Sequence, residues 1–175
     1  QRSVGDLEFE AFKSLLPEFN EKTAKDFLAD LALIGSFRKD DGTILSLLSE
    51  RHGIAVDTVK THIALLVENG VLREVGPSIR FSLDVKGDLY LASHIDQIHT
   101  FDALVGWIDF WESKLHGKIL AKLETASRYC NESLAKNYVK SYFSVWIQRV
   151  TRESKVTPGY LRREHLEALS NFCHL

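Results

Sequence analysis

Apolar residues recur every three or four positions along most of the chain, which is the spacing that places side chains on one face of an α-helix. In the first half, Val59, Ile63 and Leu66 follow this rule. The same periodicity returns over residues 104–119 and 132–152. Each of the three prolines falls where another signal already indicates a break, as expected if helix interiors exclude proline. The pattern predicts a mainly α-helical protein.

Capping residues and glycines mark the ends of the helices expected in the first half. Asn20 is a good N-cap for a helix that Gly35 ends. Gly53 ends the next helix, and Asp57 is an acceptable N-cap for the one after it. That helix ends at Asn69-Gly70, where a left-handed conformation is tolerated. The helices expected here cover residues 6–16, 20–34, 43–52 and 58–69.

The period changes from helical spacing to alternation after these helices. Residues 71–75 and 79–83 alternate apolar with polar side chains, and a Gly-Pro-Ser turn sequence separates them. These residues are expected to form a small β-hairpin.

Two helices joined by a tight turn therefore lead directly into a hairpin, and the second helix bears Thr-Val-x-x-x-Ile-x-x-Leu-x-x-x-Gly, starting at Thr58. This arrangement over residues 43–83 resembles the winged helix-turn-helix of bacterial transcription regulators. Residues 57–62 and 67–72 are similar to the recognition helix and the first hairpin strand of the GntR, DeoR and related groups. The resemblance covers about 40 residues and implies double-stranded DNA as the partner.

The resemblance implies that the outward face of the second helix enters the major groove, where short polar and cationic side chains contact base edges. Lys60 and Thr61 would contact bases and Thr58 a phosphate, while His62 completes the outward arc. The wing would place further side chains on the DNA backbone or in the minor groove. The candidate DNA-binding residues are therefore Thr58, Lys60, Thr61, His62, Arg73, Ser78 and Arg80.

The formal net charge of -2 argues against a protein that coats DNA by charge alone, because non-specific affinity comes from neutralised phosphates. Charge is unevenly distributed, with -4 over residues 1–92 and +2 over 93–175. Residues 128–163 hold eight Lys or Arg and only two Glu. This basic segment is either a phosphate-contacting surface or a set of solvated helix faces.

Protein docking is the alternative function for the first domain, because some winged helices serve as docking modules. A net charge of -4 suits a polyanion poorly, and Asp57 and Glu74 near the expected contact surface would repel phosphate. A docking surface should present large apolar side chains, whereas the outward arc carries mainly Thr, Lys and His. The composition of the arc favours DNA.

The second half is expected to be a separate helical domain, which gives domains over residues 1–92 and 93–175, with a short last helix near 161–169. Trp107 and Phe110 widen the apolar stripe of its first long helix beyond one narrow seam. Such aromatic residues either pack in the core, line a ligand pocket or form a subunit interface. Because few helices are available to cover wide apolar sectors, and because operators are commonly two-fold symmetric, we expect a homodimer.

Catalytic and metal-binding motifs are not found. His94, Asp96 and His99 are the strongest metal candidates, but two histidines five residues apart diverge on a straight helix. The chain has no Gly-x-Ser-x-Gly elbow, phosphate-cradling glycine loop or His-Glu-x-x-His motif. Cys130 and Cys173 are too few for a disulfide framework and are expected to be reduced core residues. We therefore expect neither an enzyme nor a cofactor or metal.

No apolar run approaches the ~20 residues that span a bilayer, and no basic-then-apolar leader opens the chain, so we expect a cytoplasmic protein without membrane contact. The sequence as a whole predicts a DNA-binding transcriptional regulator. It would have an N-terminal winged-helix domain with two extra leading helices and a helical domain for dimerisation. Sensing of a small-molecule or protein effector is compatible with this function, and the alternative is a non-enzymatic assembly protein that docks another protein on its winged helix.

Overall fold

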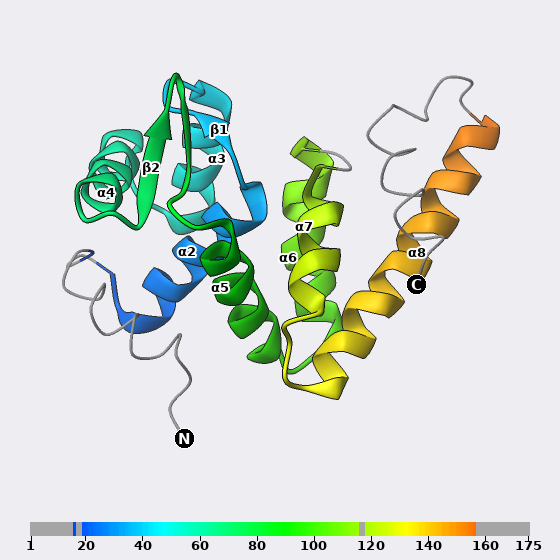
Figure 1. The fold of residues 1–175 in the computed structure, drawn as a ribbon. Helices are drawn as coiled ribbons and strands as arrows, with labels where there is room; N and C mark the ends of the chain where they lie inside the picture. Colours follow the sequence, from blue (N-terminus) through cyan, green and yellow to red (C-terminus); the bar gives the residue numbers. More distant parts are fainter. Residues whose placement is uncertain (1–15, 17–18, 116–117, 157–175) are drawn as a thin grey trace. The chain divides into compact units, whose positions relative to one another are not determined.

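The computed structural model describes residue 16 and residues 19–115 and 118–156 (Figure 1). Within them the chain forms seven helices and three strands, in the order α2 (Glu21–Ile34), β1 (Phe37–Arg38), α3 (Gly42–His52), α4 (Val56–Glu68), β2 (Leu72–Val75), β3 (Ser78–Phe81), α5 (Asp84–Asp96), α6 (Phe101–Leu115), α7 (Lys118–Ser127) and α8 (Ser133–Val156). The prediction of a mainly α-helical fold with a small hairpin is confirmed. The helices expected over 6–16 and 161–169 lie outside the described residues. None of the described helices is long and apolar enough to cross a membrane.

The chain forms two compact units, the first ending at His94 and the second beginning at Ile95. Both this division and the expected one after residue 92 fall inside α5, a helix that the sequence analysis did not predict. Gly87 lies within this helix and is buried. A Cβ atom at this position would come within 3.2 Å of Phe81 Cδ2. The glycine therefore allows α5 to lie close to the side chain of Phe81, the last residue of β3.

The predicted ends of α2 and α3 are confirmed. Asn20 Oδ1 accepts a hydrogen bond from Thr23 N at 2.9 Å, and Gly35 follows α2 with a φ of 73°. Asp41 caps α3 by accepting two backbone hydrogen bonds of 3.1 Å from its first turn. Gly53 ends α3 in the left-handed conformation, with a φ of 64°, which residues with a Cβ rarely adopt.

The start of α4 differs from the prediction. Ala55 is the N-cap and makes no side-chain capping hydrogen bond, so the assignment of Asp57 as the cap is wrong. Asp57 lies in the first turn instead, where the helix dipole still favours a negative charge. At the other end Asn69 is the C-cap and Gly70 has a φ of 74°, as the Asn-Gly pair indicates.

The predicted hairpin is joined by a third strand. β2 and β1 both pair antiparallel with β3, which gives the order β1-β3-β2. Phe37 lies opposite Ile79, and Leu72 lies opposite Phe81. All four side chains are buried, so this face of the sheet covers the core. β1 is not predictable from the sequence, because two residues are too few to show alternation.

In the second unit, α6 ends at Leu115 and α7 begins at Lys118, so the single helix expected over 104–119 is wrong. Leu115 and Ile119 are four residues apart and fit one apolar stripe, so spacing alone does not reveal that they belong to two helices. The helix expected over 132–152 is confirmed as α8. The largest fully buried side chains of this unit are Trp111, Trp146 and Tyr142.

Candidate functional site

α4 buries one face and exposes the other. Val59, Ile63 and Leu66 are each at most 4% exposed, and the helix packs against α3 and β2. The residues exposed along its other face are Asp57, Lys60, Thr61, Ala64 and Glu68. This face, which we call the α4 surface, carries short and charged side chains but no large apolar one.

His62 lies in the core, so the expectation that it belongs to the outward arc is wrong. Its residue is 3% exposed, and its ring packs edge-on against Phe19 and Phe27, with ring centroids 4.7 and 5.9 Å away. Position 62 is three residues after Val59 and precedes Ile63, which makes it an inward position of the same stripe. The spacing of apolar residues along α4 was therefore sufficient to predict that His62 is buried. His62 therefore holds α4 in place and is not part of its exposed surface.

The other predicted helix residues do lie on or beside the α4 surface. Lys60 Nζ is 3.2 Å from Asp57 Oδ1, and the Thr61 hydroxyl donates to the Asp57 carbonyl oxygen at 2.9 Å. Thr58 is half-buried at the edge of this surface. Because exposed ion pairs of this kind contribute only ~0–1 kcal/mol, Lys60 can exchange Asp57 for another anion at little cost.

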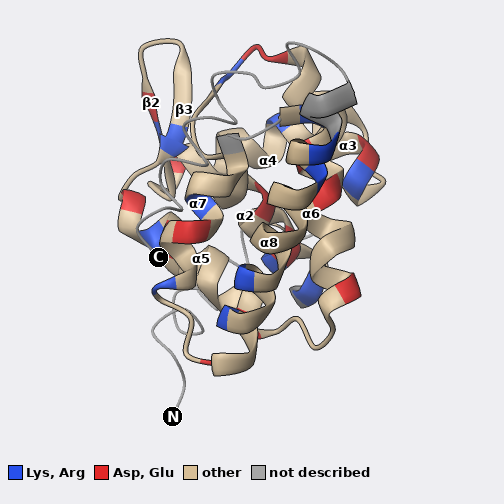
Figure 2. Ribbon diagram, turned by 90° about the vertical axis from the view of Figure 1, so that its right-hand side faces the viewer, with Lys and Arg blue, Asp and Glu red and all other residues tan. Residues whose placement is uncertain are grey.

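The predicted hairpin residues share the outer face of the sheet. Arg73 lies opposite Arg80, and Ser78 is two residues from Arg80 on β3, so all three are on the face opposite the core. Pairing of β1 with β3 adds Arg38 to this face, directly opposite Ser78. The position of Arg38 on this face is not predictable from the sequence, because nothing local indicates that β1 pairs with β3. Figure 2 shows Lys and Arg positions in blue on the hairpin labelled β2 and β3.

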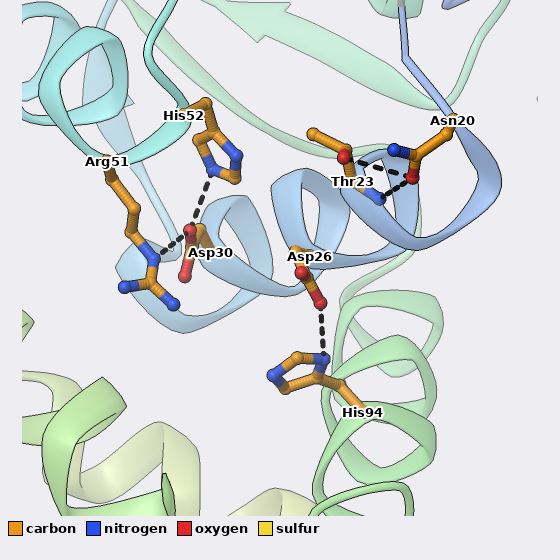
Figure 3. A network of polar contacts seen from close by, with 7 residues as sticks. All are labelled: Asn20, Thr23, Asp26, Asp30, Arg51, His52 and His94. Atoms are coloured by element: carbon orange, nitrogen blue, oxygen red, sulfur yellow. Dashed lines mark hydrogen bonds and ion pairs between the residues drawn. The ribbon is translucent and has the colours of Figure 1, made fainter.

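A buried carboxylate holds the end of α3 at the point where the chain turns toward α4 (Figure 3). Asp30 of α2 is 0% exposed, and its Oδ2 accepts a hydrogen bond of 2.6 Å from Arg51 Nε. His52 Nε2 lies 2.9 Å from the same oxygen, and the His52 ring packs edge-on against Phe27. Arg51 and His52 are the last two residues of α3. The contacts therefore fix the helix end that precedes the α4 surface.

His94 of α5 makes a separate contact with α2, with Nδ1 3.4 Å from Asp26 Oδ1. Burial lowers the pKa of His94 from its ordinary value, and this outweighs the opposing attraction of Asp26 and Asp30. Arg51 and Lys22 lower the pKa further by repulsion. His94 is therefore neutral in the folded protein at pH values where the unfolded chain already binds a proton.

This pKa shift makes the stability of the first unit depend on pH. Because the unfolded state binds the proton first, the stability should fall as the pH decreases below about 6.5. His94→Gln should remove that part of the dependence, and urea unfolding between pH 7.5 and 5 measures it. His99→Gln, at an exposed position, is the matched control. Equal pH dependence in wild type and His94→Gln would contradict the assignment.

The three residues considered as metal ligands have no shared contact among the described interactions. His94 pairs with Asp26, whereas Asp96 accepts a hydrogen bond of 2.9 Å from the backbone N of Asn131, just before α8. The side chain of His99 is exposed. In the part of the chain that the structure describes, no group of three His, Cys, Asp or Glu residues is arranged to hold a metal ion.

Two cations of the basic segment 128–163 are engaged in ion pairs within the second unit. Arg128 Nε donates to Glu124 at 2.9 Å, and Arg149 Nη2 lies 3.1 Å from Asp109 of α6. The Arg149 pair joins α8 to α6 and so has a structural role. Among the Lys and Arg residues of the segment, those whose side chains lie outside the described part are Lys155, Arg162 and Arg163.

Most of the aromatic residues that the structure describes in the second unit are buried. Trp111, Tyr142 and Trp146 are each 0% exposed. The Tyr142 hydroxyl donates to Asp109 at 2.8 Å, and burial raises the pKa of Tyr142 above its ordinary range. Trp146 Nε1 donates to Glu112 at 3.0 Å. Core packing accounts for these residues, so their number no longer indicates a second subunit.

Comparison of the chain with protein-family models, with curated proteins and with solved structures gives no match. A functional proposal therefore rests on the geometry of the two units.

Proposed function

We propose that the first unit is a winged helix-turn-helix domain that binds double-stranded DNA sequence-specifically, and that the protein is a transcriptional regulator. In this unit two helices joined by a short turn lead into a hairpin, which is the order expected for this class of domain. α3 and α4 would be the helix-turn-helix, and β2 and β3 would be the wing.

The observation that carries the proposal is the α4 surface. α4 has 13 residues and is therefore about 20 Å long, and its exposed face is free of large apolar side chains. A helix of this kind fits a major groove about 12 Å wide, with Lys60 and Thr61 directed at base edges and Ala64 allowing close approach. Lys60 would leave Asp57 when it contacts a base.

The dimer is the second part of the proposal. Two-fold symmetric operators require two recognition helices, one from each subunit. On α8, Leu134 and Val145 are 52% and 41% exposed, and they share a helix face because they are eleven residues, or three turns, apart. We propose that the second unit mediates self-association, and light scattering that shows a single chain at micromolar concentration would rule this out.

Docking of another protein is the alternative function, and one observation favours it. Leu83, Val85 and Leu89, at and before the start of α5, are 56%, 48% and 43% exposed. Large exposed apolar side chains gathered on one segment are typical of protein contact surfaces. They lie outside the α4 surface, so docking there does not compete with the role proposed for α4.

Selection from a pool of random duplex DNA distinguishes the two functions. The purified chain is incubated with the pool at low and near-physiological salt, and the retained duplexes are sequenced. A palindromic motif that survives the higher salt is the expected result for a dimeric, sequence-specific regulator. Absence of retention at low salt would overturn DNA binding and leave docking as the function.

The double variant Lys60→Ala/Thr61→Ala should lose discrimination between the selected duplex and random duplex. Each base contact typically contributes ~1–3 kcal/mol, so the ratio of the two affinities should fall at least tenfold. Competition binding at fixed salt measures the ratio. Lys22→Ala, an exposed cation on α2, is the control for loss of charge alone. An unchanged ratio in the double variant would show that α4 does not contact bases.

A further inference from the structure

The hydroxyl group of Thr61 is turned toward its own helix. Its Oγ1 donates a hydrogen bond of 2.9 Å to the carbonyl oxygen of Asp57, one turn earlier in α4. Threonine can make this bond within a helix, and the bond fixes the rotation about Cα–Cβ. Because Cβ carries one hydroxyl and one methyl branch, the methyl group is the branch that the helix backbone does not engage. Thr61 can therefore offer an apolar group to a partner, although its residue type is polar.

Ala64 lies beside Thr61 on the α4 surface and adds a second methyl group. The two residues are exposed and three positions apart, so they are neighbours on one helix face, with Cβ atoms about 5–6 Å apart. The charged residues of this surface come before or after the pair in the helix, and they are Asp57, Lys60 and Glu68. The middle of the α4 surface is therefore a small apolar patch between charged ends.

One group in the major groove of DNA matches a patch of two methyl groups. Thymine presents its C5-methyl group there, and alanine and the methyl group of threonine are among the side chains that contact it. 5-Methylcytosine carries the same group at the same ring position. A base edge that offers only hydrogen-bond donors and acceptors would be desolvated against the patch without a partner, which is unfavourable. The chemistry of the patch therefore favours a pyrimidine with a C5-methyl group.

We propose that Thr61 and Ala64 recognise the C5-methyl group of a pyrimidine in the major groove, so that the preferred duplex carries thymine or 5-methylcytosine beneath them. The proposal rests on the proposed function, and it names the base that this part of α4 distinguishes. Recognition comes from burial of apolar surface and involves no phosphate, so the preference for the methyl group should be the same at low and near-physiological salt. Lys60 remains the side chain that donates to an acceptor on a neighbouring base.

Removal of single methyl groups from the DNA tests the proposal. Each thymine of the selected duplex is replaced in turn with deoxyuridine, which has the same hydrogen-bonding groups but no C5-methyl group. At one of these positions the affinity of the wild-type chain should fall about fourfold, the factor that corresponds to one buried methyl group. At that position 5-methylcytosine should likewise bind about fourfold more tightly than cytosine, although the base pair is now G·C. Competition binding at fixed salt measures both ratios.

Two variants of Thr61 separate its methyl group from its hydroxyl group. Thr61→Ser keeps the hydroxyl and lacks the methyl group, so it should lose most of the preference for thymine over deoxyuridine. Thr61→Val keeps the methyl group and lacks the hydroxyl, so it should retain the preference. Thr43→Ser is the matched control, because Thr43 is an exposed threonine of α3 outside the α4 surface, and this variant should also retain the preference.

Three results would overturn the inference and leave sequence-specific binding by α4 standing. The first is a selected motif that contains no thymine, and the second is a wild-type chain that binds every deoxyuridine duplex as tightly as the parent duplex. The third is an unchanged preference in Thr61→Ser, which would mean that the methyl group of Thr61 does not contact the base. Failure of the wild-type chain to retain any duplex would instead overturn the proposed function itself, and this inference with it.

Discussion

Replacing Asp30 with alanine is expected to destabilise the first unit by about 3 kcal/mol. Asp30 is fully buried, and its removal leaves Arg51, whose side chain is only 24% exposed, without the carboxylate that accepts its hydrogen bond. Removal of one partner from a buried ion pair typically costs ~3–5 kcal/mol, because the remaining charge stays desolvated. Urea unfolding followed by far-UV circular dichroism measures the loss.

Asp40→Ala is the matched control for this prediction. It removes an aspartate of the same unit that also accepts hydrogen bonds from an arginine, but this pair with Arg38 is exposed on both sides. Its unfolding midpoint should stay close to that of the wild type. If Asp30→Ala were as stable as Asp40→Ala, the Asp30 network would not hold α3 against α2.

Replacing Trp146 with alanine should destabilise the second unit by about 3–5 kcal/mol. Trp146 is 0% exposed and lies on the inward face of α8, and truncation of a buried tryptophan removes apolar contacts and leaves a cavity. It also leaves Glu112, which accepts its Nε1 hydrogen bond, without that donor. Trp107 and Trp111 remain in the same unit, so tryptophan emission during urea unfolding still follows its transition.

Gln148→Ala is the control two residues further along the same helix. Gln148 is exposed, and surface substitutions away from special features usually change stability by less than about 0.5 kcal/mol. The unfolding midpoint of Gln148→Ala should equal that of the wild type, and the midpoint of Trp146→Ala should be far lower. Similar midpoints in the two variants would mean that α8 does not pack through the face on which Trp146 lies.

Most helix positions were predictable because they follow from interactions between residues close in the chain. Asn20 caps the turn three residues ahead of it, and Gly35, Gly53 and Gly70 adopt positive φ values where the periodic segments end. The spacing of Val59, Ile63 and Leu66 likewise identified the buried face of α4. These signals act within one or two helical turns, so they are visible in the sequence.

The candidate site was predicted only in part. Lys60 and Thr61 lie on the exposed face of α4, and Arg73 and Arg80 share one face of the hairpin, because helical and strand periodicity alone place them there. His62 was misplaced because its type suggested a contact residue, although its spacing from Val59 and Ile63 indicated the core. For His62, its position within the apolar spacing of α4 predicted burial correctly, whereas its residue type suggested an exposed contact residue.

The sequence by itself determined the mainly helical fold, the hairpin and the polar character of the α4 surface, because each depends on local periodicity and capping. Only the tertiary structure decided that β1 brings Arg38 opposite Ser78, forty positions further along the chain. Only the tertiary structure paired Asp30 with Arg51, twenty-one positions apart, and so fixed the end of α3. Contacts between distant residues depend on how helices and strands pack, and no local pattern encodes which partners meet.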